Sequence, residues 1–148
     1  MARNECRGAE RGPQMTAVVR LSVALGVALV CQSALAQEPA KPNLVLREVV
    51  QGMPQSERQE VQVLTATIAP GQSTVFHTHR FPVTVYMLEG AFTLEMEGRE
   101  PVTVRAGQSM VEPPNIRMTG FNRSATETIR LVIFYVAEPG TPFLHPIH

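Results

Sequence analysis

Aspartate and tryptophan are absent from this sequence, lysine occurs only at Lys41, and the two cysteines are Cys6 and Cys31. The long remainder of the chain therefore has no disulfide, no thiolate metal ligand and no cysteine nucleophile. Without aspartate, an aspartyl-phosphate mechanism is excluded. Lys41 lies between Pro39 and Pro42 in a segment that looks like a linker, which argues against a Schiff-base lysine.

Clusters of like charge are also missing. The 13 basic and 13 acidic residues give a formal net charge of zero, and no basic block or Arg/Lys stripe is present. This composition predicts no nucleic-acid partner. No G-x-S-x-G nucleophile elbow and no glycine-rich phosphate loop occur either. Whether the protein is an enzyme stays open, and the chemistry left to it is acid–base catalysis by histidine or metal-assisted catalysis.

The N-terminal segment has the three parts of a secretory signal peptide. A basic residue, Arg20, precedes an uncharged stretch, and an A-x-A cleavage site ends at Ala36. The stretch is shorter than the roughly twenty apolar residues of a transmembrane helix, so cleavage is favoured over a stable membrane anchor. We therefore predict a signal peptide over residues 1–36, with Met15 as an alternative start. The protein is expected to be exported, to the periplasm in a Gram-negative bacterium, and its mature form would contain no cysteine.

After the signal, the sequence is typical of an all-β domain. Glycines divide it into short runs rich in β-branched residues, and several runs alternate between apolar and polar residues, as half-buried strands do. We expect a linker at 37–43, a barrel at 44–138 and an extended tail at 139–148. The expected strands are Leu44–Val50, Val61–Ile68, Ser73–His77, Val83–Glu89, Ala91–Met96, Val102–Arg105, Ser109–Glu112 and Ile129–Val136.

Two histidines separated by one residue form the first candidate site. Residues i and i+2 of a strand share a face, so His77 and His79 can point into one cavity. Two neutral imidazoles on one rigid strand are a plausible pair of metal ligands. Without further ligands, such a pair is more often a polar feature of a barrel mouth than a metal site.

Two longer motifs around this pair resemble those of the cupin family. The run from Gly71 to Gly90 contains a glycine, five residues and the H-x-H pair, as in the first cupin motif. The run from Gly107 to Asn122 resembles the second, with Pro113 in register. The resemblance covers most of the chain after the signal. It implies an all-β fold, a single cupin double-stranded β-helix (jelly-roll barrel) like that of RmlC-like cupins. It also implies a homodimer, in which pairing would cover exposed sheet edges.

The two remaining ligand positions of the family are changed here. Cupins typically hold a metal with three histidines and one glutamate, and the resemblance places the glutamate at Val83 and the third histidine at Met118. Met118 is then either an apolar filler in a cavity without metal, or a soft ligand that completes a Cu(I) site with His77 and His79. In a third alternative, water, Glu112 or a substrate completes a weak site. The cofactor is accordingly one cuprous or divalent ion, Cu, Fe, Mn, Ni or Zn, or none.

The strand that follows the histidines has an apolar inward face. The expected ligand pocket therefore consists of His77, His79, Val83, Val85, Met87 and Met118. Such a pocket suits a small, largely apolar molecule. The first hypothesis is an exported module that binds this small-molecule ligand without an essential metal. The alternatives are a metal-dependent cupin enzyme of the dioxygenase or isomerase type, and a copper-binding protein.

Other polar residues are expected to be structural. Glu112 is interpreted as a salt-bridge partner in preference to a general base. Arg80 and Arg117 are interpreted as solvated surface charges. His145 and His148 are expected on the surface of a loose C-terminal tail.

Overall fold

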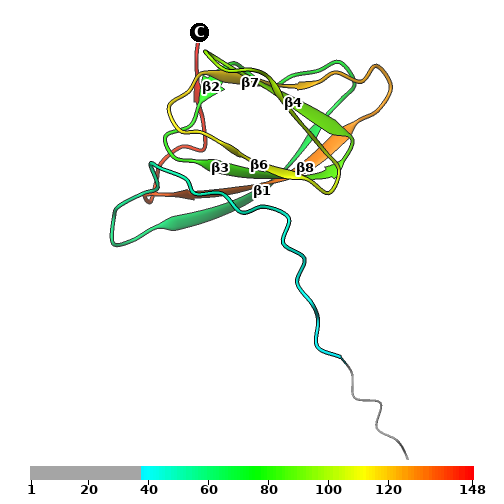
Figure 1. The fold of residues 1–148 in the computed structure, drawn as a ribbon. Helices are drawn as coiled ribbons and strands as arrows, with labels where there is room; N and C mark the ends of the chain where they lie inside the picture. The colour runs from blue at the N-terminus through cyan, green and yellow to red at the C-terminus, as the bar shows by residue number, and fades with distance from the viewer. Residues whose placement is uncertain (1–37) are drawn as a thin grey trace, which may run out of the picture. The chain divides into compact units, whose positions relative to one another are not determined.

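The structure of the protein is a computed structural model that describes residues 38–148 (Figure 1). The predicted signal peptide, residues 1–36, lies outside the described residues, as do Cys6 and Cys31. Ala40–His148 form one compact unit. Within the described range, no helix is long and apolar enough to cross a membrane.

All regular elements of residues 38–148 are β-strands, and they form two antiparallel sheets. The first sheet has the order β1-β8-β3-β6, and the second has the order β5-β4-β7-β2-β9. Figure 1 shows the two sheets facing each other across the interior of a barrel. The all-β barrel expected from the sequence is thus confirmed. The strands are β1 (Glu60–Ile68), β2 (His77–Thr78), β3 (Val83–Glu89), β4 (Ala91–Met96), β5 (Val102–Arg105), β6 (Ser109–Glu112), β7 (Met118–Asn122), β8 (Ile129–Ala137) and β9 (His145–Pro146).

Alternating burial explains why most strands form where the sequence expected them. Along β8, buried residues alternate with partly or fully exposed ones. This strand pairs with β1 over its whole length and with β3 on its other side. Each strand therefore turns one face towards the core. This is why apolar and polar residues alternate with a period of two along the sequence. The core residues with no exposed surface are Val83, Met87, Leu94, Met118, Ile129, Tyr135 and Ala137.

Two glycines are required by their surroundings. Gly90 turns the chain between β3 and β4 with a φ of 75°, and a Cβ there would lie 2.5 Å from Cγ2 of Ile129. Gly120 lies within β7 against Phe92, and a Cβ at this position would overlap the Phe92 ring. Neither position accepts a side chain unless the barrel wall shifts.

The strand predicted at Leu44–Val50 does not form. This segment is an extended arm, in which Leu44 is 65% and Val49 is 97% exposed. Its β-rich composition does not supply the hydrogen-bonding neighbour that a strand needs, so the prediction from composition was wrong. The strand expected at Ser73–His77 is reduced to β2 and an isolated bridge between Ser73 and Phe121.

The C-terminal tail was predicted to be loose, and this prediction was wrong for its last residues. In β9, His145 pairs with Thr78 and Pro146 pairs with His77. The N–H of Ile147 also donates a hydrogen bond to the carbonyl oxygen of Phe76, at 2.9 Å. A proline-containing pair of residues gives no periodic signal, and proline is tolerated here because β9 is an edge strand. The side chain of His145 is exposed, as expected.

Candidate metal centre

His77 and His79 meet inside the barrel, as their spacing predicted. Both are buried, with 4% and 1% of their surface exposed. Their Nε2 atoms lie 3.0 Å apart, and the two rings are nearly perpendicular, at 78°. Strand β2, which carries His77, is held between β7 and β9, and His79 follows directly after it, so the pair has little freedom to move apart.

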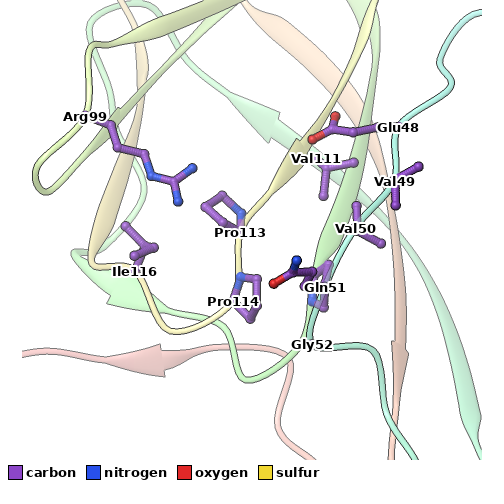
Figure 2. Close-up of a pocket in the computed structure, with 11 residues that line it drawn as sticks. Glu48, Val49, Val50, Gln51, Gly52, Arg99, Val111, Pro113, Pro114 and Ile116 are labelled. Atoms are coloured by element: carbon purple, nitrogen blue, oxygen red, sulfur yellow. The ribbon is translucent and has the colours of Figure 1, made fainter.

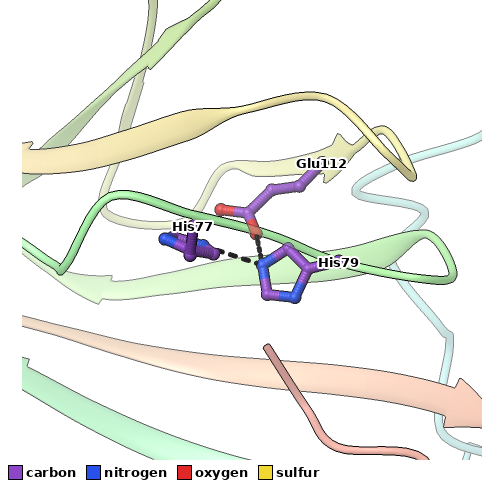
Figure 3. Close-up of side chains that lie close together, drawn as sticks. All are labelled: His77, His79 and Glu112. Carbon is purple, nitrogen blue, oxygen red and sulfur yellow. Dashed lines mark hydrogen bonds and ion pairs between the residues drawn. The ribbon is translucent and has the colours of Figure 1, made fainter. Parts of the chain in front are cut away.

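Glu112 brings a carboxylate to the same point from the opposite sheet (Figure 3). It is 5% exposed, and its Oε2 atom lies 3.1 Å from Nε2 of His79. In the pairing of β3 with β6, Glu112 is the direct partner of Val83. The carboxylate that the family pattern would place at Val83 is therefore supplied by the adjacent strand, on the same face of the sheet.

Carbonyl oxygens fix the tautomer of both imidazoles. Nδ1 of His77 lies 2.7 Å from the oxygen of Val75, and Nδ1 of His79 lies 2.7 Å from the oxygen of Phe143. A carbonyl oxygen only accepts, so each Nδ1 carries a proton, and each ring directs its Nε2 towards the other. In a neutral ring with this tautomer, the Nε2 lone pair is free to bind a metal. Metal-binding histidines are typically oriented in this way.

The convergence of these groups favours a positive charge at the centre. Two nitrogen lone pairs and a carboxylate, all buried, repel one another unless a proton or a cation lies between them. Burial lowers the pKa of His77. The Nδ1–H bond to Val75 opposes this shift, His79 reinforces it, and Glu112 opposes it. His77 is therefore mainly neutral at pH 7, which is the form that binds metals.

The donor set fits a transition-metal ion. One ligand atom from each of His77, His79 and Glu112 can be chosen so that all three lie within 4.8 Å of one another. Two nitrogens about 2.1 Å from one ion and at right angles to each other would be about 3.0 Å apart, which matches the observed separation of the two Nε2 atoms. Two imidazoles and a carboxylate are the ligands of the facial-triad sites that hold non-haem iron.

Met118, the other sequence candidate, lies next to the pair but within the core. The register of β2 and β7 pairs it directly with His77, and it has no exposed surface. Val83 and Met87 are likewise fully buried core residues. The six predicted pocket residues are thus all buried in the barrel, but three of them serve as packing around the site.

A small cavity of about 60 Å³ adjoins the metal centre. Of the predicted pocket residues, His77, His79 and Val85 line it, together with Glu112. Almost all of the rest of its wall is apolar and comes from both sheets and the C-terminal segment: Ala66, Ile68, Thr74, Phe92, Leu131, Ile133, Phe143 and Leu144. Space of this size holds a few water molecules or one very small ligand.

A larger groove of about 470 Å³ lies outside the barrel (Figure 2). The arm at 48–52 forms one wall, and Pro113, Pro114 and Ile116 form another, with the side chain of Arg99 at one end. The groove shares no residue with the metal centre. Its volume alone does not make it the better candidate, because it contains no buried, converging polar groups.

Comparison with known families identifies the barrel. Residues 64–135 match the cupin domain. The chain contains a cupin domain. This match runs from within β1 to Tyr135 in β8 and includes both motifs of the sequence. It confirms the small single-domain cupin that the sequence resembled.

Several solved structures share the fold of this chain. A cupin-like protein from Thermotoga maritima is 17% identical, with a TM-score of 0.51 over 59% of this cupin and 64% of that chain. A DMSP lyase structure is 15% identical, with a TM-score of 0.51 over 60% of this cupin and 44% of that chain. A double-stranded β-helix protein from Klebsiella pneumoniae is 18% identical, with a TM-score of 0.51 over 70% and 91%. This cupin thus spans less than two thirds of the first two. No match was found among curated proteins.

The sequence understated the part played by Glu112 and missed that of Phe143. Glu112 was interpreted mainly as a salt-bridge partner, and only in a third alternative as a group that completes a weak metal site; it does lie beside His79. The sequence signal for a role at the site was the position of Glu112 in its strand. Glu112 lies two residues after Met110, so both share the inward face of β6, whose other residues point outward. Phe143 had no such signal, since it reaches the site only through the path of the C-terminal segment.

Proposed function

We propose that this cupin binds one divalent transition-metal ion through His77, His79 and Glu112. The observation that supports it is the convergence of two Nε2 atoms 3.0 Å apart with a buried carboxylate oxygen 3.1 Å from one of them. This donor set suits Fe(II), and also Mn(II), Ni(II) or Zn(II), better than it suits Cu(I). When bound, such an ion supplies Lewis-acid or redox chemistry at its remaining coordination positions.

The surrounding residues limit what can reach the ion. Drug-sized pockets measure about 300–1,000 Å³, whereas the cavity here measures about 60 Å³. Its wall is apolar apart from the ligands themselves and Thr74. We infer that the natural ligand is uncharged and contains few heavy atoms. This favours the metal-dependent enzyme among the hypotheses, with a reaction of the dioxygenase type ahead of an isomerase that must enclose a larger substrate.

Two other functions keep a specific observation in their favour. Met118 is the cross-strand partner of His77, so its thioether remains available for a Cu(I) site. The apolar wall of the cavity suits a module that binds a small apolar molecule without metal. Both make predictions about metal content that differ from those of the proposed site.

Export and dimer formation are part of the same proposal. Export to the periplasm rests on the signal-peptide pattern at residues 1–36. A homodimer is supported by the outer face of the first sheet, where Val61, Val63 and Phe134 are 68%, 61% and 44% exposed. Such an apolar face, on an edge strand and its neighbour, is typical of an interface. Phe134→Glu should convert a dimer to monomer in light scattering, and a wild-type monomer would contradict the proposal.

Metal content is the experiment that tests the proposed site. The full chain without a polyhistidine tag is purified and reconstituted with Fe(II), Mn(II), Ni(II), Zn(II) or Cu(I), and the retained metal is measured by elemental analysis. We expect one tightly held divalent ion, which His79→Ala and Glu112→Gln lose. Glu100→Gln, an exposed glutamate, is the matched control and should retain it.

The alternatives give different results in the same experiment. Failure to retain any metal would overturn the proposal and favour the metal-free binding module. A preference for Cu(I) that Met118→Leu removes, with Glu112→Gln unaffected, would select the copper site.

A further inference from the structure

The last residues of the chain, Thr141–His148, pass over the metal centre, and we call them the C-terminal strap. After β8, a turn in which the N–H of Thr141 donates to the oxygen of Glu138 directs the chain back towards β2. Strand β9 and the hydrogen bond from Ile147 to Phe76 then fix the strap to the edge of the second sheet. Figure 1 shows this red segment running from the first sheet to the second.

Phe143 is the strap residue that contacts the metal centre. Its ring lies 4.8 Å from the ring of His79 and 5.6 Å from that of Tyr135, measured between centroids. With Leu144, it closes part of the cavity. Its main-chain oxygen accepts the Nδ1–H hydrogen bond of His79, across 64 positions of sequence.

The two imidazoles differ in what orients them. His77 donates its Nδ1–H to Val75, which lies two positions earlier in the same segment. His79 donates its Nδ1–H to Phe143 of the strap, which lies 64 positions later in the sequence. Removal of the strap would leave the local bond of His77 in place. It would deprive His79, which is 1% exposed, of the acceptor that selects its tautomer.

We propose that Phe143 is a positioning residue of the metal centre, and that the C-terminal strap holds His79 in its metal-binding tautomer through the Phe143 carbonyl. The effect on metal affinity rests on the proposed function, whereas the effect on the tautomer does not. Loss of a group that orients a ligand typically lowers metal affinity by about 10- to 100-fold. The Phe143 ring adds a separate effect, because it covers the cavity and slows exchange with the solvent.

Tyr135 contacts the strap from within the barrel core. It has no exposed surface, and burial raises the pKa of its hydroxyl group, so the hydroxyl remains a donor at neutral pH. Its oxygen lies 3.5 Å from the carbonyl oxygen of Pro142, which is a long and weak contact. The strap is therefore held mainly by β9, by His79 and by packing of the Phe143 ring.

The test separates the carbonyl of Phe143 from its ring. Three chains are compared with the wild type: one that ends at Pro142 and lacks the carbonyl, Phe143→Ala, which keeps it, and a control that ends at Ile147. The ¹⁵N shifts of the histidine rings, recorded in the metal-free proteins at alkaline pH, report each tautomer. Competition with a chelator for Zn(II) reports the affinity.

We expect the chain that ends at Pro142 to show mixed tautomers at His79 but an unchanged Nδ1–H tautomer at His77, with affinity reduced about 10- to 100-fold. Phe143→Ala should keep the wild-type tautomers and most of the affinity, and release metal faster. The control should match the wild type. A single wild-type tautomer at His79 in the folded, truncated chain would overturn the proposal.

A second variant covers the case in which truncation unfolds the barrel. Ile147→Pro removes the N–H that donates to Phe76, together with the partly buried isoleucine side chain, so it loosens the strap in an otherwise complete chain. It should mix the His79 tautomers partly, and a single wild-type tautomer at His79 in this variant would count against the inference. If the wild type retains no metal at all, the proposed function fails, and the tautomers still decide whether the strap positions His79.

Discussion

Replacing Glu112 with glutamine should separate metal binding from barrel stability. The substitution keeps the size of the side chain but removes the negative charge and one acceptor oxygen. In the metal-free protein, the amide N–H₂ can donate to the Nε2 lone pair of His79, which lies 3.1 Å from the present Oε2 atom. Because this hydrogen bond satisfies both groups, we expect the free energy of unfolding of the metal-free barrel to change by less than about 1 kcal/mol.

The metal-bound protein should behave differently. Truncating one partner of a buried charge pair costs about 2–5 kcal/mol, which corresponds to a loss of metal affinity of roughly 30-fold or more. For the wild type, a metal concentration of 100 times the dissociation constant stabilises the fold by about 2.7 kcal/mol. In a domain of this size, that raises the melting temperature by roughly 10 °C. At the same metal concentration, the increase in Glu112→Gln should be about a third of this or less.

Thermal unfolding with and without metal measures both quantities at once. Glu100→Gln, which changes an exposed carboxylate, controls for the loss of charge itself. A metal-induced increase as large in Glu112→Gln as in the wild type would refute the idea that this carboxylate is a ligand. A large loss of stability in the metal-free variant would refute the hydrogen-bonding argument.

Three further predictions follow from cross-strand register, burial and packing. Glu112→Val should abolish metal retention, and adding Val83→Glu should restore part of it, because the two positions are direct partners on one face of the sheet. If elemental analysis finds no recovery of metal in the double variant, the two positions are not equivalent. Burial lowers the pKa of His77 below 6.5, so the unfolded chain takes up a proton first as the pH falls. The stability of the metal-free protein should therefore decrease as the pH drops through 6.5. In urea titrations, the stability of His77→Gln should depend less on pH than that of the wild type, and an equal dependence would contradict this prediction. Gly120→Ala should destabilise the barrel by about 1–3 kcal/mol, since its Cβ would overlap the ring of Phe92; Gly98→Ala, where no atom lies within 4 Å of the added Cβ, tests the strain of a positive φ alone.

The sequence by itself determined the fold and half of the site. Strands β3 to β6 begin and end where alternation and turn residues placed them, because a period of two is a local property of the chain. The same local rule put His77 and His79 on one face. It failed for Leu44–Val50, because composition cannot say whether a neighbouring strand is present.

Tertiary structure alone decided which groups join the two histidines. His77 lies in β2 of the second sheet and His79 follows directly after that strand, whereas Glu112 belongs to the first sheet. They meet only because the sheets close into a barrel. The family pattern pointed to Val83 for the carboxylate. Only the register of β3 with β6 shows that Glu112, on the adjacent strand, is the direct partner of Val83. Phe143 reaches His79 from 64 positions away. Such contacts depend on register and closure, which are properties of paired strands and which no single stretch of sequence carries.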